Sequence, residues 1–92
     1  MKIIRDRKFL ESLKNILEFI AQDSLKQSLL FNDKLNKKIE ELPFMPYKFR
    51  ESIYHSNNNI RDLIFMGYSI PYLVEEEKIV ILNIFKGKKE DN

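Results

Sequence analysis

The chain has 92 residues, a formal net charge of +2 from 16 basic and 14 acidic side chains, and no cysteine. This length predicts one domain over residues 1–92, and without thiols there are no disulfides, thiolate metal sites or cysteine nucleophiles. With 43% hydrophobic residues the chain is too apolar for disorder, while apolar runs such as Ile79–Leu82 are far shorter than a membrane span of about 20 residues. No secretion signal is recognisable, so we expect a cytoplasmic protein.

The start of the chain predicts a short strand and a helix. Lys2–Ile4 is a strand candidate, and Asp6 is a helix cap. Apolar residues then recur at spacings of one, three and four, which is typical of an amphipathic helix with one apolar stripe. That stripe consists of Phe9, Leu10, Leu13, Ile16, Leu17 and Ile20.

A second helix is predicted to follow directly. Ser24 and Gln27 form a capping box, and an apolar stripe runs from Leu25 to Leu42. Pro43 and Pro46 end the helix, because proline lacks the N–H that continues the hydrogen-bond ladder. So short a link between two helices predicts an antiparallel hairpin.

The second half of the chain predicts strands. After a polar loop at His55–Asn59, strands are expected at Ile60–Phe65, Tyr68–Val74 and Ile79–Phe85. Met66–Gly67 supplies the turn between the first two. The third stretch is the most hydrophobic, so it is expected in the centre of the sheet.

The predicted fold class is α+β, with the order β-α-α-β-β-β and the helix hairpin packed on one face of a small antiparallel sheet. Pro71 removes one ladder donor from its strand, which predicts an edge position or a bulge there. We expect the opposite sheet face to be only partly covered and to carry the functional surface.

Catalytic and metal-binding motifs are sparse. His55 is the single histidine and is interpreted as a solvated loop residue rather than a general acid or base. No histidine pair suggests a metal site, and the two isolated glycines form no phosphate-binding loop. We therefore expect neither a metal nor a cofactor.

Five cations are grouped in the second half of the chain: Arg50, Arg61, Lys86, Lys88 and Lys89. If they converge on one sheet face, they form a surface for phosphate groups or an acidic peptide. The alternative is that the arginines pair with neighbours such as Glu51 and Asp62 while the lysines are solvated.

Aromatic residues are interleaved with these cations. They either stack on nucleic-acid bases or pack within the sheet. The set comprises Tyr47, Phe49, Tyr54, Phe65, Tyr68 and Tyr72.

The chain resembles toxins of the RelE/ParE family. Residues 59–74 read Asn-Ile-Arg-Asp-Leu-Ile-Phe-Met-Gly-Tyr-Ser-Ile-Pro-Tyr-Leu-Val, similar to the family's arginine followed by Gly-Tyr-x-Ile-x-Tyr-x-Val. Residues 79–89 resemble the family's last strand and basic end, and residues 20–24 and 42–50 are similar to its ParE branch. The resemblance implies the toxin of a type II toxin–antitoxin module, neutralised by a cognate antitoxin.

The resemblance leaves two targets open. ParE-like toxins inhibit DNA gyrase by binding it, whereas RelE-like toxins are endoribonucleases that cut mRNA on the ribosome. In the second case the implied catalytic residues are Arg61, Lys86 and Lys89. The helix hairpin favours the ParE branch, as does Ile64, which stands where the RelE branch has a strand arginine.

The antitoxin is expected to bury a groove between the helix hairpin and the sheet. Its apolar contacts are predicted at Phe44, Tyr47, Tyr54 and Tyr72, and its acidic contacts at the five cations. A homodimer, or a larger assembly with the antitoxin, is left open.

Overall fold

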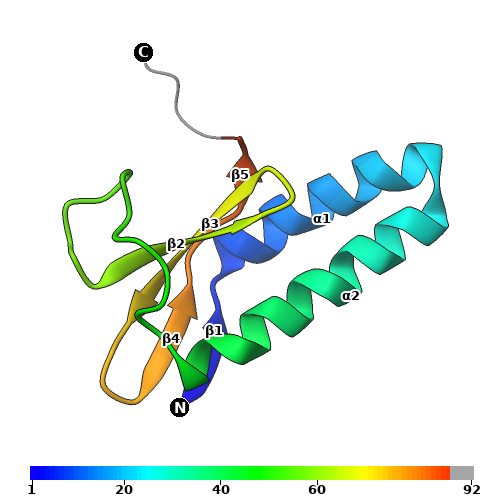
Figure 1. Cartoon of the computed structure of the whole chain (residues 1–92). Coiled ribbons are helices and arrows are strands. Elements are labelled where there is room, and N and C mark those ends of the chain that lie inside the picture. The colour runs from blue at the N-terminus through cyan, green and yellow to red at the C-terminus, as the bar shows by residue number, and fades with distance from the viewer. Residues whose placement is uncertain (88–92) are drawn as a thin grey trace.

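A helix hairpin packs against one face of a mixed sheet in the computed structural model, which describes residues 1–87 (Figure 1). Lys88 and Lys89 lie outside the described residues. In chain order the elements are β1 (Lys2–Arg5), α1 (Arg7–Asp23), α2 (Leu25–Glu41), the short 3-10 helix η1 (Leu42–Phe44), β2 (Ile60–Phe65), β3 (Tyr68–Val74), β4 (Lys78–Ile81) and β5 (Phe85–Lys86).

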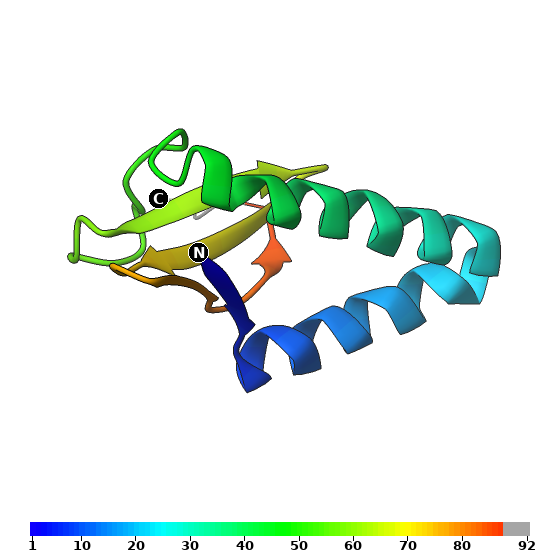
Figure 2. The ribbon, with the colours of Figure 1, turned by 90° about the horizontal axis from the view of Figure 1, so that it is seen from below.

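Both predicted helix starts are confirmed. The Asp6 carboxylate accepts a hydrogen bond from the N–H of Lys8 at 3.1 Å, and the Ser24 hydroxyl accepts one from the N–H of Gln27 at 3.1 Å. Each cap satisfies a backbone donor that the first helical turn leaves unpaired. Ser24 alone separates α1 from α2, so the two helices return antiparallel and extend together beyond the sheet (Figure 2).

The sheet is mixed, so the expectation of an antiparallel sheet is wrong at one edge. The strand order is β1-β4-β3-β2, with β5 also beside β3. β1 runs parallel to β4, whereas the other neighbours are antiparallel. Parallel neighbours need a long connection, and everything between β1 and β4 supplies it. The turn between β2 and β3 is formed by Met66 and Gly67 with φ of +49° and +85°, as in a type I′ hairpin.

Pro71 lies in a central strand, so of the two predicted alternatives, an edge position or a bulge, the edge position is wrong. On one side of β3, β4 pairs with Tyr72–Val74 and β5 pairs with Tyr68 and Ser69, which leaves Pro71 at the gap between them. The Pro71 carbonyl still accepts a hydrogen bond from the N–H of Leu82 at 2.9 Å. The missing N–H therefore faces a break in the ladder, where the predicted last strand is split into β4 and β5.

The hydrophobic core lies between the hairpin and the sheet. Phe31 of α2 packs edge-on against Phe65 and Tyr68, with ring centroids 5.3 and 5.4 Å apart. Fully buried side chains from both helices and three strands complete this core: Phe9, Leu35, Ile39, Leu63, Ile70, Tyr72, Ile79 and Ile81.

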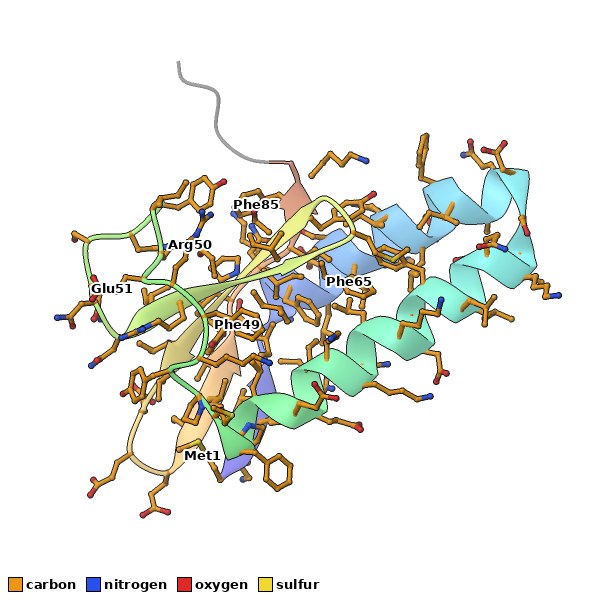
Figure 3. All side chains as sticks on the ribbon, viewed as in Figure 1. Met1, Phe49, Arg50, Glu51, Phe65 and Phe85 are labelled. Atoms are coloured by element: carbon orange, nitrogen blue, oxygen red, sulfur yellow. The ribbon has the colours of Figure 1, made fainter. Side chains whose placement is uncertain are left out.

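A long loop, residues 45–59, passes around β2 from the helix-covered face of the sheet to the opposite face. Its segment at Arg50–Ser52 runs along the outer edge of β2, where Asp62 N–H donates to the Arg50 carbonyl and Ser52 N–H donates to that of Ile60. Figure 3 shows Arg50 and Glu51 in this loop, away from the helices. Neither helix in residues 1–87 has the length and apolarity needed to cross a membrane.

Candidate partner-binding surfaces

Arg61 fastens the loop to the sheet. One guanidinium nitrogen, Nη1, donates to the carbonyls of Tyr47 and Phe49 at 3.4 and 3.1 Å. The guanidinium carbon also lies 4.7 Å from the centre of the Tyr47 ring, a cation–π contact. These contacts make Arg61 a positioning residue for residues 47–49.

Arg50 is paired with a buried carboxylate. Its Nη2 lies 3.3 Å from Oδ2 of Asp62, whose side chain is fully buried. The same oxygen accepts a hydrogen bond from the N–H of Ile53 at 3.2 Å. The pairing of Arg50 with Asp62 is one of the alternatives that the sequence left open, and it ties the loop to β2.

The described cations do not converge on one sheet face, so that prediction is wrong. Arg61 is the register partner of Tyr72 and Lys86 that of Tyr68, which places both cations on the helix-covered face. Asp62, one residue after Arg61, points to the opposite face, and Arg50 reaches it there. Along β3, Tyr68 and Tyr72 are four residues apart, so the Cα atoms of their partners Arg61 and Lys86 are separated by at least about 13 Å.

The predicted aromatic contacts are also dispersed. Phe44 and Tyr47 are exposed, at 84% and 50%. Tyr54 instead packs edge-on against Phe85, with ring centroids 4.9 Å apart. Tyr72 is fully buried and donates its hydroxyl to the Pro46 carbonyl at 2.7 Å, so it is no surface contact.

Burial raises the pKa of Tyr72 to about 12, against the opposing effect of the nearby Arg61 charge. Between pH 10 and 12 the folded chain therefore keeps a proton that the unfolded chain releases. This contribution to stability is complete below pH 10 and is lost as the pH rises to about 12, a change of about 2–3 kcal/mol.

Tyr72→Phe is expected to lower the free energy of unfolding by about 1 kcal/mol at neutral pH, because the Pro46 carbonyl loses its donor. Above pH 10 the variant is expected to lose less stability than the wild-type chain, until the curves of unfolding free energy against pH for the two proteins approach or cross. Urea unfolding monitored by circular dichroism from pH 7 to 12 measures both effects. Parallel curves across that range would contradict the role assigned to the buried phenol.

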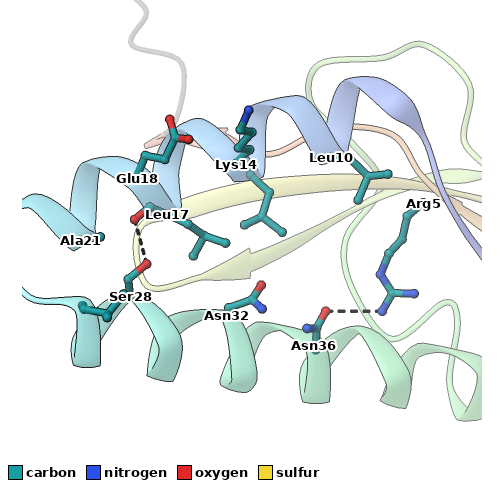
Figure 4. A pocket seen from close by; sticks show the side chains of 11 residues that line it. Arg5, Leu10, Lys14, Leu17, Glu18, Ala21, Ser28, Asn32 and Asn36 are labelled. Atoms are coloured by element: carbon teal, nitrogen blue, oxygen red, sulfur yellow. Dashed lines mark hydrogen bonds between the residues drawn. The ribbon is translucent and has the colours of Figure 1, made fainter.

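An elongated groove lies between α1 and α2, and sequence reasoning did not identify it (Figure 4). Its volume is about 560 Å³, and its apolar lining is Leu10, Leu13, Leu17, Ala21 and Leu25. Polar side chains line the rest of it: Arg5, Lys14, Glu18, Ser28, Asn32 and Asn36.

Two hydrogen bonds fix the ends of this groove. Buried Ser28 donates to the Leu17 carbonyl at 2.7 Å, which holds the helices close near the hairpin turn. At the other end Nη2 of Arg5 donates the second hydrogen bond, to Oδ1 of Asn36 at 3.4 Å. Lys14 makes no ion pair within residues 1–87, so its charge is available to a ligand.

The sequence feature that could have predicted this groove is the width of the apolar stripe on α1. Of its six residues only Phe9 and Leu13 are buried, whereas Leu10 is 49% exposed. A stripe wider than the core requires leaves apolar surface for a second contact.

A second groove, also about 560 Å³, lies between α1 and the sheet, where the antitoxin groove was predicted. Lys86 lines it and sits 4.9 Å above the Tyr68 ring. None of the four predicted apolar contacts lines it; its apolar walls come from Ile16, Phe19, Tyr68, Ile84 and Phe85.

The remaining chemistry in residues 1–87 is modest. His55 is exposed in the loop, as predicted, but its Nδ1 lies 3.2 Å from the Ser52 hydroxyl, a contact that was not predicted. No group of three or more histidine or acidic side chains in this part of the chain is arranged to hold a metal ion.

Comparison with known proteins identifies the family. A family model described as the ParE toxin of the type II toxin–antitoxin system parDE matches residues 3–90. A solved structure described as the chromosomal ParDE toxin–antitoxin system from P. aeruginosa has the same fold, with a TM-score of 0.79 at 19% identity over 96% of this chain and 97% of that one. No curated protein sequence matches significantly. Because the family model spans nearly the whole sequence, the chain belongs to the ParE toxins of type II toxin–antitoxin systems.

Proposed function

We propose that this toxin arrests growth by binding DNA gyrase and is not an enzyme. The observation that carries this proposal is the placement of Arg61 and Lys86 at distant positions on the helix-covered face. Cleavage of RNA at one phosphate requires its catalytic groups within hydrogen-bond reach of the same reacting atoms. Arg61 is also engaged with two backbone carbonyls, which supports a structural role.

Two assays on one preparation test the target. We expect purified toxin to inhibit DNA supercoiling by gyrase, and to leave mRNA intact in a translating ribosome extract. Codon-phased cuts in the mRNA, with supercoiling unaffected, would instead establish the ribonuclease alternative. A heat-denatured sample of the same toxin serves as the control for both assays.

We further propose that the cognate antitoxin inhibits the toxin by placing an amphipathic helix in the groove between α1 and α2. From Leu10 to Ala21 the groove follows α1 for about 16 Å, which matches roughly three turns of a bound helix. Its apolar lining fits the apolar face of such a helix. Arg5 and Lys14 outweigh Glu18 and favour acidic residues along its border.

A further inference from the structure

Three leucines are exposed on the outer side of α2. Leu25, Leu29 and Leu30 are 65%, 62% and 39% exposed, and together with Lys26 and Asp33 they line a hollow of about 560 Å³. We call these five residues the α2 stripe. The buried residues of α2 face the core on its other side. Where α2 begins, near the hairpin turn, Figures 1 and 2 show only α1 beside it. So much exposed apolar surface on two helical turns is typical of an interaction site.

The α2 stripe is complementary to itself. Lys26 and Asp33 are seven residues, or two turns, apart and bracket Leu29 and Leu30 on the same side of the helix. When two copies of α2 lie antiparallel about a twofold axis between Leu29 and Leu30, Lys26 of each copy faces Asp33 of the other. Leu29 then faces Leu30, so the apolar and the charged contacts are both made twice.

The charges of the stripe are free to make these contacts. Asp33 pairs with Lys37 at 3.7 Å, but both side chains are about 70% exposed, and such surface pairs contribute little. The formal net charge of the whole chain is only +2, so long-range repulsion between copies is small.

We propose that two copies of this chain associate through the α2 stripe, helix against antiparallel helix. Three leucines per copy provide less contact than the roughly 1,200 Å² buried in a stable complex, so the dimer is weak, with a dissociation constant on the order of 100 µM. This surface is distinct from the interior of the antitoxin groove, with which it shares only Leu25.

Sedimentation velocity between about 10 µM and 1 mM tests the proposal with charge-swapped variants. The wild-type chain is expected to shift toward the dimer as its concentration rises. Asp33→Lys places lysine opposite lysine and is expected to weaken association at least about tenfold. The double variant Lys26→Asp/Asp33→Lys restores opposite charges and is expected to recover it. Glu76→Lys, the same charge change in the exposed turn before β4, is the control and is expected to behave as wild type.

A wild-type chain that stays monomeric up to 1 mM would overturn the proposal, as would an Asp33→Lys variant that associates as well as wild type. If the chain is monomeric and Leu29→Glu weakens the antitoxin complex more than about tenfold, the stripe belongs to the antitoxin and not to a second copy. Thermal melts establish that each variant is folded before its association is measured.

Discussion

Leu10→Asp is expected to weaken antitoxin binding about 100-fold. Leu10 is half exposed and lines the groove between α1 and α2, so the substitution leaves the core intact. In the complex the new carboxylate would be buried against the apolar face of the antitoxin helix, and even if Lys14, one turn along α1, pairs with it, both charges must leave water. Desolvation of a buried charge that is only partly compensated costs about 3 kcal/mol in affinity, which corresponds to the stated factor. Calorimetric titration of toxin with antitoxin measures the change.

The matched control for this prediction is Ile53→Asp. Ile53 is 58% exposed in the loop on the opposite side of the sheet, so the same charge is introduced into a similarly exposed position. We expect its antitoxin affinity to equal that of the wild-type chain. Equal losses in the two variants, or an unchanged affinity for Leu10→Asp, would place the antitoxin elsewhere.

Arg50→Met is expected to lower the free energy of unfolding by about 3 kcal/mol. Methionine retains the length of the side chain but leaves the fully buried Asp62 carboxylate with only the N–H of Ile53 as a donor. The Asp62 side chain is fully buried whereas that of Arg50 is 45% exposed, so the substitution leaves a carboxylate that is out of water and without its counter-charge, which is strongly destabilising. Urea unfolding at pH 7 gives the difference directly.

A second substitution separates this mechanism from a general effect of the loop. Asp62→Asn removes the negative charge that Arg50→Met leaves unpaired, while preserving an acceptor oxygen. The Arg50→Met/Asp62→Asn variant is therefore expected to recover at least half of the lost stability. If the double variant is no more stable than Arg50→Met, or if Arg50→Met costs less than about 1 kcal/mol, the ion pair does not hold the loop.

Much of the fold could be predicted because its signals are local. The caps at Asp6 and Ser24 and the turn at Met66–Gly67 each depend on a few neighbouring residues, and all three are confirmed. The parallel pairing of β1 with β4 could not be read in this way, since it joins residues more than 70 positions apart. The break opposite Pro71 depends likewise on β4 and β5 together.

The candidate site was harder to predict, because the sequence gives the charged residues but does not show which of them pair with each other. The sequence shows that Arg50, Arg61 and Asp62 are close together along the chain, but it does not show on which sheet face each side chain lies. A shift of one residue along β2 reverses the face, so Arg61 and Asp62 point apart, and Arg50 follows Asp62. The apolar stripe of the first helix did include residues that line the groove. Periodicity alone, however, does not distinguish residues that pack in the core from residues that contact a partner protein.

The most direct test of the account is a titration of toxin against a fixed amount of gyrase, with supercoiling as the readout. An inhibitor that acts by binding is expected to give a break point near one toxin per gyrase binding site, and added antitoxin should restore activity in the same proportion. Catalytic damage that accumulates at far lower toxin ratios, or supercoiling that is unaffected at any ratio, would contradict the account.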